Sequence, residues 1–286
     1  MYSVKSLIAA GAASLLSSAA FAADMPIAAP PVYAPPAEFG GWYLRGDIGF
    51  SNQSVKSVRN TNDALYADNL SFSQQTAFDT GGIFGVGAGY QFNNWFRMDV
   101  TGQYRGNSNF KGTDLTTFAT GFGVANGVDN YDASKSEWLF LVNAYADLGT
   151  WWCVTPFIGA GVGAARVSIS NFIDNGTSNE HINPNYIGGP PVASVVTAAN
   201  GSQWNFAWAL HAGLAYQVSP NLTLELAYSY VNLGNGTTGV DSAFDGSAGG
   251  HVFKFNNITS NDLKLGVRWN LEPAAPAYMP PLITKG

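Results

Sequence analysis

The sequence has 286 residues, of which 46% are hydrophobic and only 11% are charged, and its net charge is −6. Soluble domains carry about 25% charged residues, so this chain has too little charge to cover an ordinary soluble surface, and its acidic balance excludes a basic nucleic-acid surface. The apolar residues never form the run of about 20 that a membrane-spanning helix needs. The single cysteine excludes an internal disulfide framework.

The two ends of the sequence are predicted to lie outside the folded domain. A lysine near the start precedes an apolar segment from Leu7 to Leu16, and Ala20-Phe21-Ala22 matches an A-x-A cleavage site. We therefore predict a secretory signal peptide over residues 1–22. Residues 23–39 and 272–286 are rich in proline, which favours an extended periplasmic arm before the domain and an extended tail after it.

Residues 40–271 show a repeated two-residue period, which is typical of β-strands. From Trp42 to Phe50 the even-numbered positions are apolar or glycine, whereas Arg45 and Asp47 stand at odd-numbered positions. One face of this segment is thus apolar and the other charged. The period predicts eight strands: Trp42–Phe50, Phe84–Phe92, Phe96–Arg105, Glu137–Leu148, Pro156–Val167, Asn205–Val218, Leu222–Tyr230 and Asp262–Leu271.

The connections between these strands alternate in length. The long ones are Ser51–Gly81, Gly106–Lys135, Ser168–Gln203 and Gly234–Thr259, and the short ones are Asn93-Asn94, Thr150–Cys153 and Ser219–Asn221. Outer-membrane barrels combine long external loops with short periplasmic turns. We predict an all-β fold, an eight-stranded antiparallel transmembrane β-barrel with four long external loops and three short periplasmic turns.

The apolar face is predicted to look outward to lipid and the charged face inward. The charged face is rich in glycine and alanine, which suits a crowded interior, and it carries both signs of charge, which can pair across a narrow lumen. Leu139 and Leu141 interrupt this face, and His211 is expected to join it. The predicted lumen charge network is Arg45, Asp47, Arg97, Asp99, Arg105, Glu137, Asp147, Glu225, Asp262, Lys264 and Arg268.

Aromatic residues gather near the ends of the predicted strands, where amphipathic rings would meet the membrane interface. The predicted aromatic girdle comprises Trp42, Trp95, Trp138, Trp151, Trp152, Trp204 and Trp269. Its two belts bracket the apolar band and favour a location in the outer membrane.

Three segments also carry a resemblance. Gly40-Gly41-Trp42-Tyr43-Leu44-Arg45-Gly46, the run from Thr155 to Gly163 and Leu263-Lys264-Leu265-Gly266-Val267-Arg268-Trp269 resemble the small porin-like outer-membrane β-barrel proteins of Gram-negative bacteria, which are related in architecture to the OmpA transmembrane domain. The resemblance covers Gly40 to Leu271. It implies a structural, surface-antigen or weak porin role, without a catalytic site.

The sequence offers no pattern for catalysis, a cofactor or a metal. His181, His211 and His251 are too dispersed for a metal motif. The Gly159-x-Gly161-x-Gly163 run has no helical pattern after it, so its glycines are interpreted as strand packing and not as a nucleotide loop. We expect no enzyme and no cofactor.

The predicted function is a structural and surface role with a narrow ion-paired lumen. Two alternatives stay open, a small-solute porin and loop-mediated binding of an external ligand. The expected partners are outer-membrane lipid, lipopolysaccharide and the outer-membrane assembly machinery, with self-association left open and nucleic acid excluded. Candidate contacts to lipopolysaccharide phosphates, or simply solubilising charges, are Lys56, Arg59, Lys111, Lys135 and Arg166.

Overall fold

The computed structural model describes residues 40–121, 123–179, 191–244, 246 and 249–271, which all belong to one unit, Glu38–Ala275. The predicted signal peptide, arm and tail, together with His181, lie outside the described residues. Within the described part of the chain no helix is long and apolar enough to cross a membrane.

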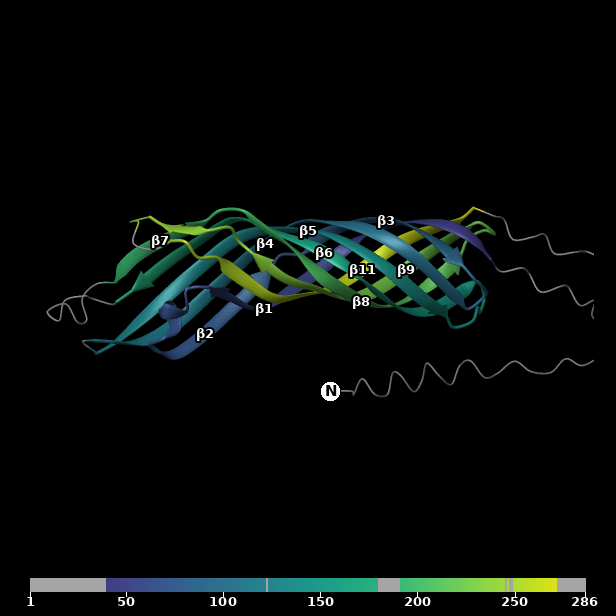
Figure 1. Cartoon of the computed structure of the whole chain (residues 1–286). Coiled ribbons are helices and arrows are strands. Elements are labelled where there is room, and N and C mark those ends of the chain that lie inside the picture. Colours follow the sequence, from purple (N-terminus) through teal and green to yellow (C-terminus); the bar gives the residue numbers. More distant parts are fainter. Residues whose placement is uncertain (1–39, 122, 180–190, 245, 247–248, 272–286) are drawn as a thin grey trace, which may run out of the picture. The chain divides into compact units, whose positions relative to one another are not determined.

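Eight antiparallel strands close into a ring (Figure 1). In ring order they are β1 (Gly41–Asn60), β3 (Gly81–Gln91), β4 (Phe96–Thr120), β5 (Gly123–Asp147), β6 (Val154–Ser178), β8 (Gly201–Gln217), β9 (Leu222–Thr237) and β11 (Phe253–Asn270). β11 pairs back onto β1, from Tyr43 opposite Asn270 to Asn60 opposite Phe253. Every strand of the ring thus has two partners, and the predicted eight-stranded antiparallel ring is confirmed.

One end of the ring holds three short connections, residues 92–95, 148–153 and 218–221, and is called the turn end below. In the first of them, Asn93 Oδ1 accepts hydrogen bonds from the backbone amides of Trp95 (3.0 Å) and Phe96 (2.8 Å). An asparagine that bonds its own following backbone in this way is a common turn former. These connections lie where the sequence predicts the short turns.

At the opposite end the strands are much longer than predicted. β4 and β5 have 25 residues each, and only residues 121–122 connect them. Most of the four segments predicted as loops is therefore strand, and that prediction of loop structure was wrong. Here we name the described residues within 51–80, 106–135, 168–203 and 234–259 the extension.

Three short strands complete the extension. β2 (Asn69–Phe78) pairs with the outer part of β4, β7 (Val192–Ala198) pairs with β6, and β10 (Asp241–Ala243) pairs with β7. A single 3₁₀ turn, η1 (Asp63–Tyr66), lies between β1 and β2. The extension is thus a folded continuation of the barrel wall, seen opposite the turn end in Figure 1.

Irregularities in strand pairing separate the extension from the rest of the ring. The register shifts between Arg105 and Ser108 of β4, and around Asn171 of β6 and Asn257 of β11. Asn171 and Asn257 have positive φ values, 54° and 52°, a conformation that asparagine tolerates better than most residues. β-Bulges of this kind bend a strand and increase its twist.

The interior is layered, as β5 shows along one face. Its inward positions run from Asp147, Tyr145 and Asn143 through Leu141 and Leu139 to Glu137 and Lys135, and all of these side chains are buried. The two leucines belong to a hydrophobic core that includes Val167 and Val231 and continues into the extension with Phe172 and Phe255. The prediction of a charged interior therefore holds for one part of the barrel, while a hydrophobic core fills the next.

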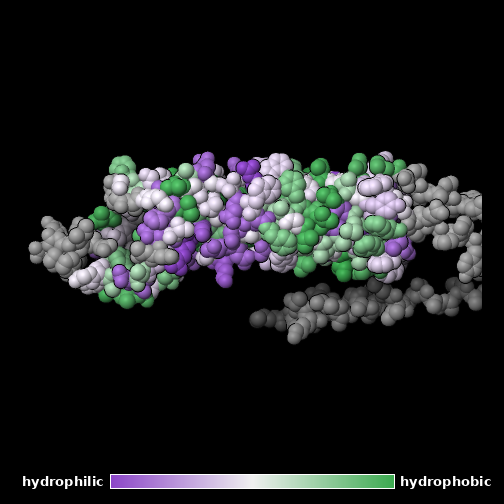
Figure 2. Space-filling view, viewed as in Figure 1, coloured by the Kyte–Doolittle hydropathy of each residue, from purple (hydrophilic) through white to green (hydrophobic). Residues whose placement is uncertain are grey.

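The outer surface divides into bands along the barrel. Large apolar side chains such as Leu44, Ile48, Leu210, Leu226 and Leu265 are about half exposed on the outside of the ring. Figure 2 shows hydrophobic surface gathered toward the turn end, with a hydrophilic zone beyond it. The apolar face therefore looks outward, as the two-residue period predicts.

Candidate functional site

The charged residues predicted for the lumen are all buried inside the ring. Their centre is Glu225 on β9, on which three arginines converge. Arg45 Nη2 lies 3.4 Å from Glu225 Oε2, while Arg97 Nη2 and Arg268 Nε lie 3.4 and 3.2 Å from Oε1. One carboxylate thus links β1, β4 and β11 to β9 across the interior.

Arg45 joins two further carboxylates to this centre. Its guanidinium contacts Asp47 at 2.8 Å and Asp99 at 2.8 Å, and it donates to the Tyr145 hydroxyl at 3.1 Å. Tyr145 can lie this close because it crosses Gly159 of the neighbouring strand, where an added Cβ would stand 2.4 Å from its ring. The inward glycine of β6 therefore gives the tyrosine its room.

Further contacts extend the predicted network beyond Glu225. Arg97 contacts Asp147 at 3.2 Å and lies over the ring of Tyr145, 4.2 Å from its centroid. Arg105 makes a bidentate contact with Asp262, at 3.0 and 2.5 Å. Lys264 is buried on β11 opposite Gly49. The bidentate contact between Arg105 and Asp262 matches the planar geometry of guanidinium and carboxylate groups.

Lys135 corrects a prediction. It was proposed as a surface contact to lipopolysaccharide, but it is 1% exposed and its ammonium group pairs with Glu137 and Gln53 inside the barrel. The signal was present in the sequence, because Lys135 stands two residues before Glu137 and so shares its face. With Lys135 included, the predicted charge network has six basic and six acidic members.

His211 lies in a polar chain beside the ion pairs. Its Nδ1 is 2.7 Å from the Ser229 hydroxyl, and its Nε2 is 3.1 Å from Asn143 Oδ1. Asn143 in turn donates to Asp99 at 2.7 Å. The histidine is thus held on both ring nitrogens by neutral groups and connects β8 to the charged centre.

The predicted girdle residues are all on the outside, between 48% and 97% exposed. Toward the extension, Trp138 packs against Tyr104 with ring centroids 5.0 Å apart, and Phe140 packs against Trp204 at 6.2 Å. At the turn end, Trp42 packs edge-on against Tyr90 at 5.4 Å. Two aromatic belts therefore border the apolar band, the arrangement that membrane barrels show at their interfaces.

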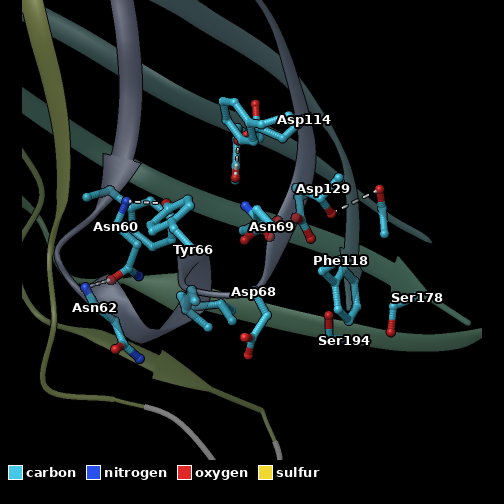
Figure 3. Close-up of a pocket in the computed structure, with 18 of the residues that line it drawn as sticks. Asn60, Asn62, Tyr66, Asp68, Asn69, Asp114, Phe118, Asp129, Ser178 and Ser194 are labelled. Carbon is cyan, nitrogen blue, oxygen red and sulfur yellow. Dashed lines mark hydrogen bonds between the residues drawn. The ribbon is translucent and has the colours of Figure 1, made fainter. Parts of the chain in front are cut away.

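A second polar site, absent from the sequence prediction, lies in the extension. A cavity of about 420 Å³ opens there between β1, η1, β4, β5 and β6. Figure 3 shows Asp114 and Asp129 on neighbouring strands of this cavity, with Asn60 and Tyr66 beside them. Asp174, Asp241 and His251 also line it, and no lysine or arginine is among the described residues of the lining. We call this the acidic cavity.

Three of its aspartates are poorly compensated. Asp114 accepts hydrogen bonds on Oδ2 from Tyr131 (2.9 Å) and Gln74 (3.1 Å), but its Oδ1 is buried without a partner. Asp174 is 9% exposed, and its Oδ1 is likewise buried without a partner. Asp114 stands directly opposite Asp129 in the ladder, so two carboxylates face one another.

Burial and mutual repulsion disfavour the ionised forms of these groups. Desolvation, reinforced by Asp129 and Asp114, raises the pKa of Asp174 to about 8. Desolvation, with a smaller contribution from Asp114, raises the pKa of Asp129 to about 6. Desolvation also raises the pKa of Asp114, although the bonds from Gln74 and Tyr131 oppose it. The surroundings of these carboxylates therefore favour their protonated forms.

Counting residues along β5 could have found part of this cavity. Asp129 and Tyr131 continue the inward positions of Lys135 and Glu137, two residues at a time. Asp114 was hidden, because the bulge after Arg105 changes the inward positions of β4 from odd to even numbers. The remaining lipopolysaccharide candidates, Lys56, Arg59, Lys111 and Arg166, are exposed on the extension or beside it.

Comparisons with known proteins agree with this architecture. Residues 8–270 match the model of the outer membrane protein beta-barrel domain family. An uncharacterized protein of Brucella abortus is 34% identical over 240 residues, covering 77% of this chain and 78% of the relative. Outer membrane protein PagN of Salmonella typhimurium is 30% identical over 240 residues, covering 80% and 89%.

Two further similarities are more distant. A Rickettsia bellii protein with a provisional adhesin name is 27% identical over 269 residues, covering 93% of this chain and 98% of that protein. Among solved structures, Neisserial surface protein A matches with a TM-score of 0.41 and 18% identity, covering 82% of this chain and 100% of that one.

Proposed function

Because the chain belongs to the outer membrane protein β-barrel domain family, we propose that it is a non-conducting outer-membrane barrel that holds a folded β-extension at the cell surface. The observation that carries this proposal is the filled interior. Ion pairs around Glu225 occupy the part toward the turn end, and the hydrophobic core that includes Leu141 and Phe172 occupies the part toward the extension. An eight-stranded barrel has little further room.

The lengths of the strands support the placement in the membrane. A tilted transmembrane strand needs about 9–11 residues. On β5, the apolar outward positions run from Trp138 to Leu148, which matches this requirement. The remaining residues of β5, from Gly123 on, then lie outside the bilayer with the rest of the extension.

The two ends of the barrel differ in a way that supports an orientation. β1 begins and β11 ends at the turn end, beside the three short connections. Short turns face the periplasm in barrels of this class, and longer segments face the outside. The extension is therefore assigned to the outer surface of the cell.

Planar-bilayer recording tests the closed lumen. The reconstituted wild-type protein is expected to give no stable single-channel steps. A variant that removes both fillings of the lumen is expected to conduct; it carries Leu141→Ala, Phe172→Ala, Phe255→Ala, Arg97→Ala and Glu225→Ala. A matched variant with Leu210→Ala, Phe206→Ala and Phe84→Ala truncates outward side chains and should stay silent. Stable steps from the wild-type protein would favour the porin alternative instead.

Recognition of an external ligand is a second candidate function. It is supported by the acidic cavity, because a cavity with unpaired carboxylates in a folded extension offers a defined binding surface. The provisional adhesin name of the Rickettsia relative agrees with a surface role of this kind. Saturable binding of a soluble ligand to whole cells, lost when the cavity aspartates are replaced, would support it.

A further inference from the structure

The acidic cavity contains negative groups without the positive partners that the lumen supplies. Every carboxylate of the lumen network around Glu225 faces an arginine, whereas the described lining of the cavity includes Asp114, Asp129, Asp174 and Asp241 and no basic side chain other than His251. The lumen network and the acidic cavity belong to the same barrel, so the lack of basic partners is a local property of the cavity. A buried carboxylate without a partner is costly, and a bound cation would remove that cost.

Asp174 is the most informative of these groups. It is more than nine-tenths buried, it lines the cavity, and its Oδ1 has no hydrogen-bond partner. Asp114 adds a second buried oxygen without a partner on the other side of Asp129. Both unpaired oxygens belong to residues that line the cavity but are themselves shielded from solvent, so a bound donor would pair with them after a small rotation of the carboxylates.

The shape of the site favours an organic cation over a metal ion. Among the described residues, no group of three His, Cys, Asp or Glu side chains could hold one metal ion. The carboxylates instead stand on three successive strands, β4, β5 and β6, which lie about 4.8 Å apart in a sheet. Phe72 and Phe118 line the same cavity, and aromatic faces attract organic cations. Tyr66 lines it too, but Arg59 already lies over its ring, 4.2 Å from the centroid.

From this arrangement we infer that the acidic cavity binds a small organic polyamine, whose ammonium groups pair with Asp114, Asp129 and Asp174. A cavity of about 420 Å³ suits a ligand of that size. The inference deepens the second proposed function, recognition of an external ligand. It rests on that proposal only for the statement that the ligand reaches the cavity from outside the cell. Binding of a polyamine to the purified protein does not depend on whether the lumen is closed. The polyamine inference and the proposal of a non-conducting barrel can therefore fail separately.

The pH dependence of binding follows from the groups around the cavity. Burial and neighbouring carboxylates raise the pKa of Asp174 to about 8 and that of Asp129 to about 6, so both must lose protons when an ammonium group binds. The other titratable groups that line the cavity are Asp68, Asp114, Asp241, Tyr66, Tyr131 and His251. Polyamine affinity should therefore rise at least tenfold between pH 5.5 and pH 8.5.

Isothermal titration calorimetry of the full chain with spermidine tests the inference. The wild-type protein is expected to bind one spermidine saturably at pH 8.5. Asp174→Asn should weaken binding at least tenfold, and Asp129→Asn should also weaken it. Asp132→Asn removes the same charge from the exposed outer face of β5 and should leave the affinity unchanged. Heat-modifiable migration on gels verifies that each variant is folded.

Several results would overturn the inference. They are the absence of spermidine binding by the folded wild-type protein, equal affinities in the Asp174→Asn and Asp132→Asn variants, and binding of Ca²⁺ or of a lysine-rich peptide without binding of spermidine. An affinity that falls as the pH rises would contradict the role given to the carboxylates.

Discussion

Leu226 tests the outward orientation at the level of one residue. Its side chain is 46% exposed on the outside of β9, between Leu214 of β8 and Leu265 of β11. An arginine in the middle of the bilayer should lower the free energy of unfolding by about 2–4 kcal/mol. Urea titration of Leu226→Arg in lipid vesicles measures this loss, with Leu226→Met as the control for shape. A neutral Leu226→Arg would show that this face does not contact lipid.

A substitution at Glu225 tests the ion pairs inside the barrel. Glu225→Ala would leave Arg45, Arg97 and Arg268 facing one another without their shared carboxylate. Breaking a buried ion pair by removing one partner typically costs about 3–5 kcal/mol. The same urea titration should show a loss of that size, whereas Asp132→Ala on the exposed face should change little. A loss below about 1 kcal/mol would mean that water replaces the carboxylate.

Residue-level prediction from the sequence succeeded where the period of two was unbroken. Arg45, Asp47, Arg97 and Asp99 are inside because each stands between apolar outward neighbours. The partner of each charge could not be predicted, because pairing across the lumen depends on the relative stagger of strands that are distant in sequence. The role of Glu225 as a common partner of three arginines is evident only from the folded ring, which brings β1, β4 and β11 around β9.

At the level of strands, the sequence located the membrane part well and the extension poorly. The outward residues of the extension include the polar side chains of Lys56, Lys111 and Asn130. Because polar and apolar residues are mixed on its outer face, the alternation that reveals the other strands is weak there. The bulges near Asn171 and Asn257 add a second obstacle, because each shifts the inward positions by one residue.

The acidic cavity makes the stability of the strands around it depend on pH. The folded state raises the pKa of Asp174 to about 8, so it binds this proton more tightly than the unfolded chain does. Stability is then highest below the ordinary pKa of aspartate, about 3.9, and falls as the pH rises toward 8. Asp129, with a pKa of about 6, contributes in the same direction.

Hydrogen–deuterium exchange of the β6 and β7 amides measures this effect locally. In the wild-type protein without added polyamine, exchange corrected for its intrinsic pH dependence should be faster at pH 8.5 than at pH 5. Asp174→Asn should reduce the difference by on the order of 1–3 kcal/mol of opening free energy, since it removes the ionising group. Equal protection of both proteins at pH 8.5 would contradict the unfavourable ionisation of Asp174.

At the level of the whole molecule, the lone cysteine reports the orientation. Cys153 is exposed at the turn end, which is assigned to the periplasm. A membrane-impermeant maleimide should therefore leave Cys153 unlabelled in intact cells and label it after detergent treatment. In a Cys153→Ser background, Val124→Cys at the far end of β5 should be labelled in intact cells, because Val124 is 59% exposed there. The reverse labelling pattern would show that the turn end, and not the extension, faces the outside of the cell.

The closed interior is a property that the sequence could suggest only in outline. Eight strands predict a narrow lumen, and Leu139 and Leu141 already signalled an apolar interruption of its charged face. The aromatic part of the core, with Phe110, Phe172 and Phe255, comes from segments that the sequence predicts as loops. Since loops have no defined inner face, these aromatic residues could not be assigned to the interior until the extension was recognised as sheet.

The β4–β5 hairpin has a mechanical consequence. Its two strands pair from Phe96 opposite Ala146 to Thr120 opposite Gly123, with one bulge on the way. Tension applied to the tip would pull both strands in the same direction and would load their hydrogen bonds to β3 and β6 in shear. Bonds loaded together in shear resist more strongly than bonds that open one after another, so the hairpin would transmit force from its tip to the ring as one stiff element.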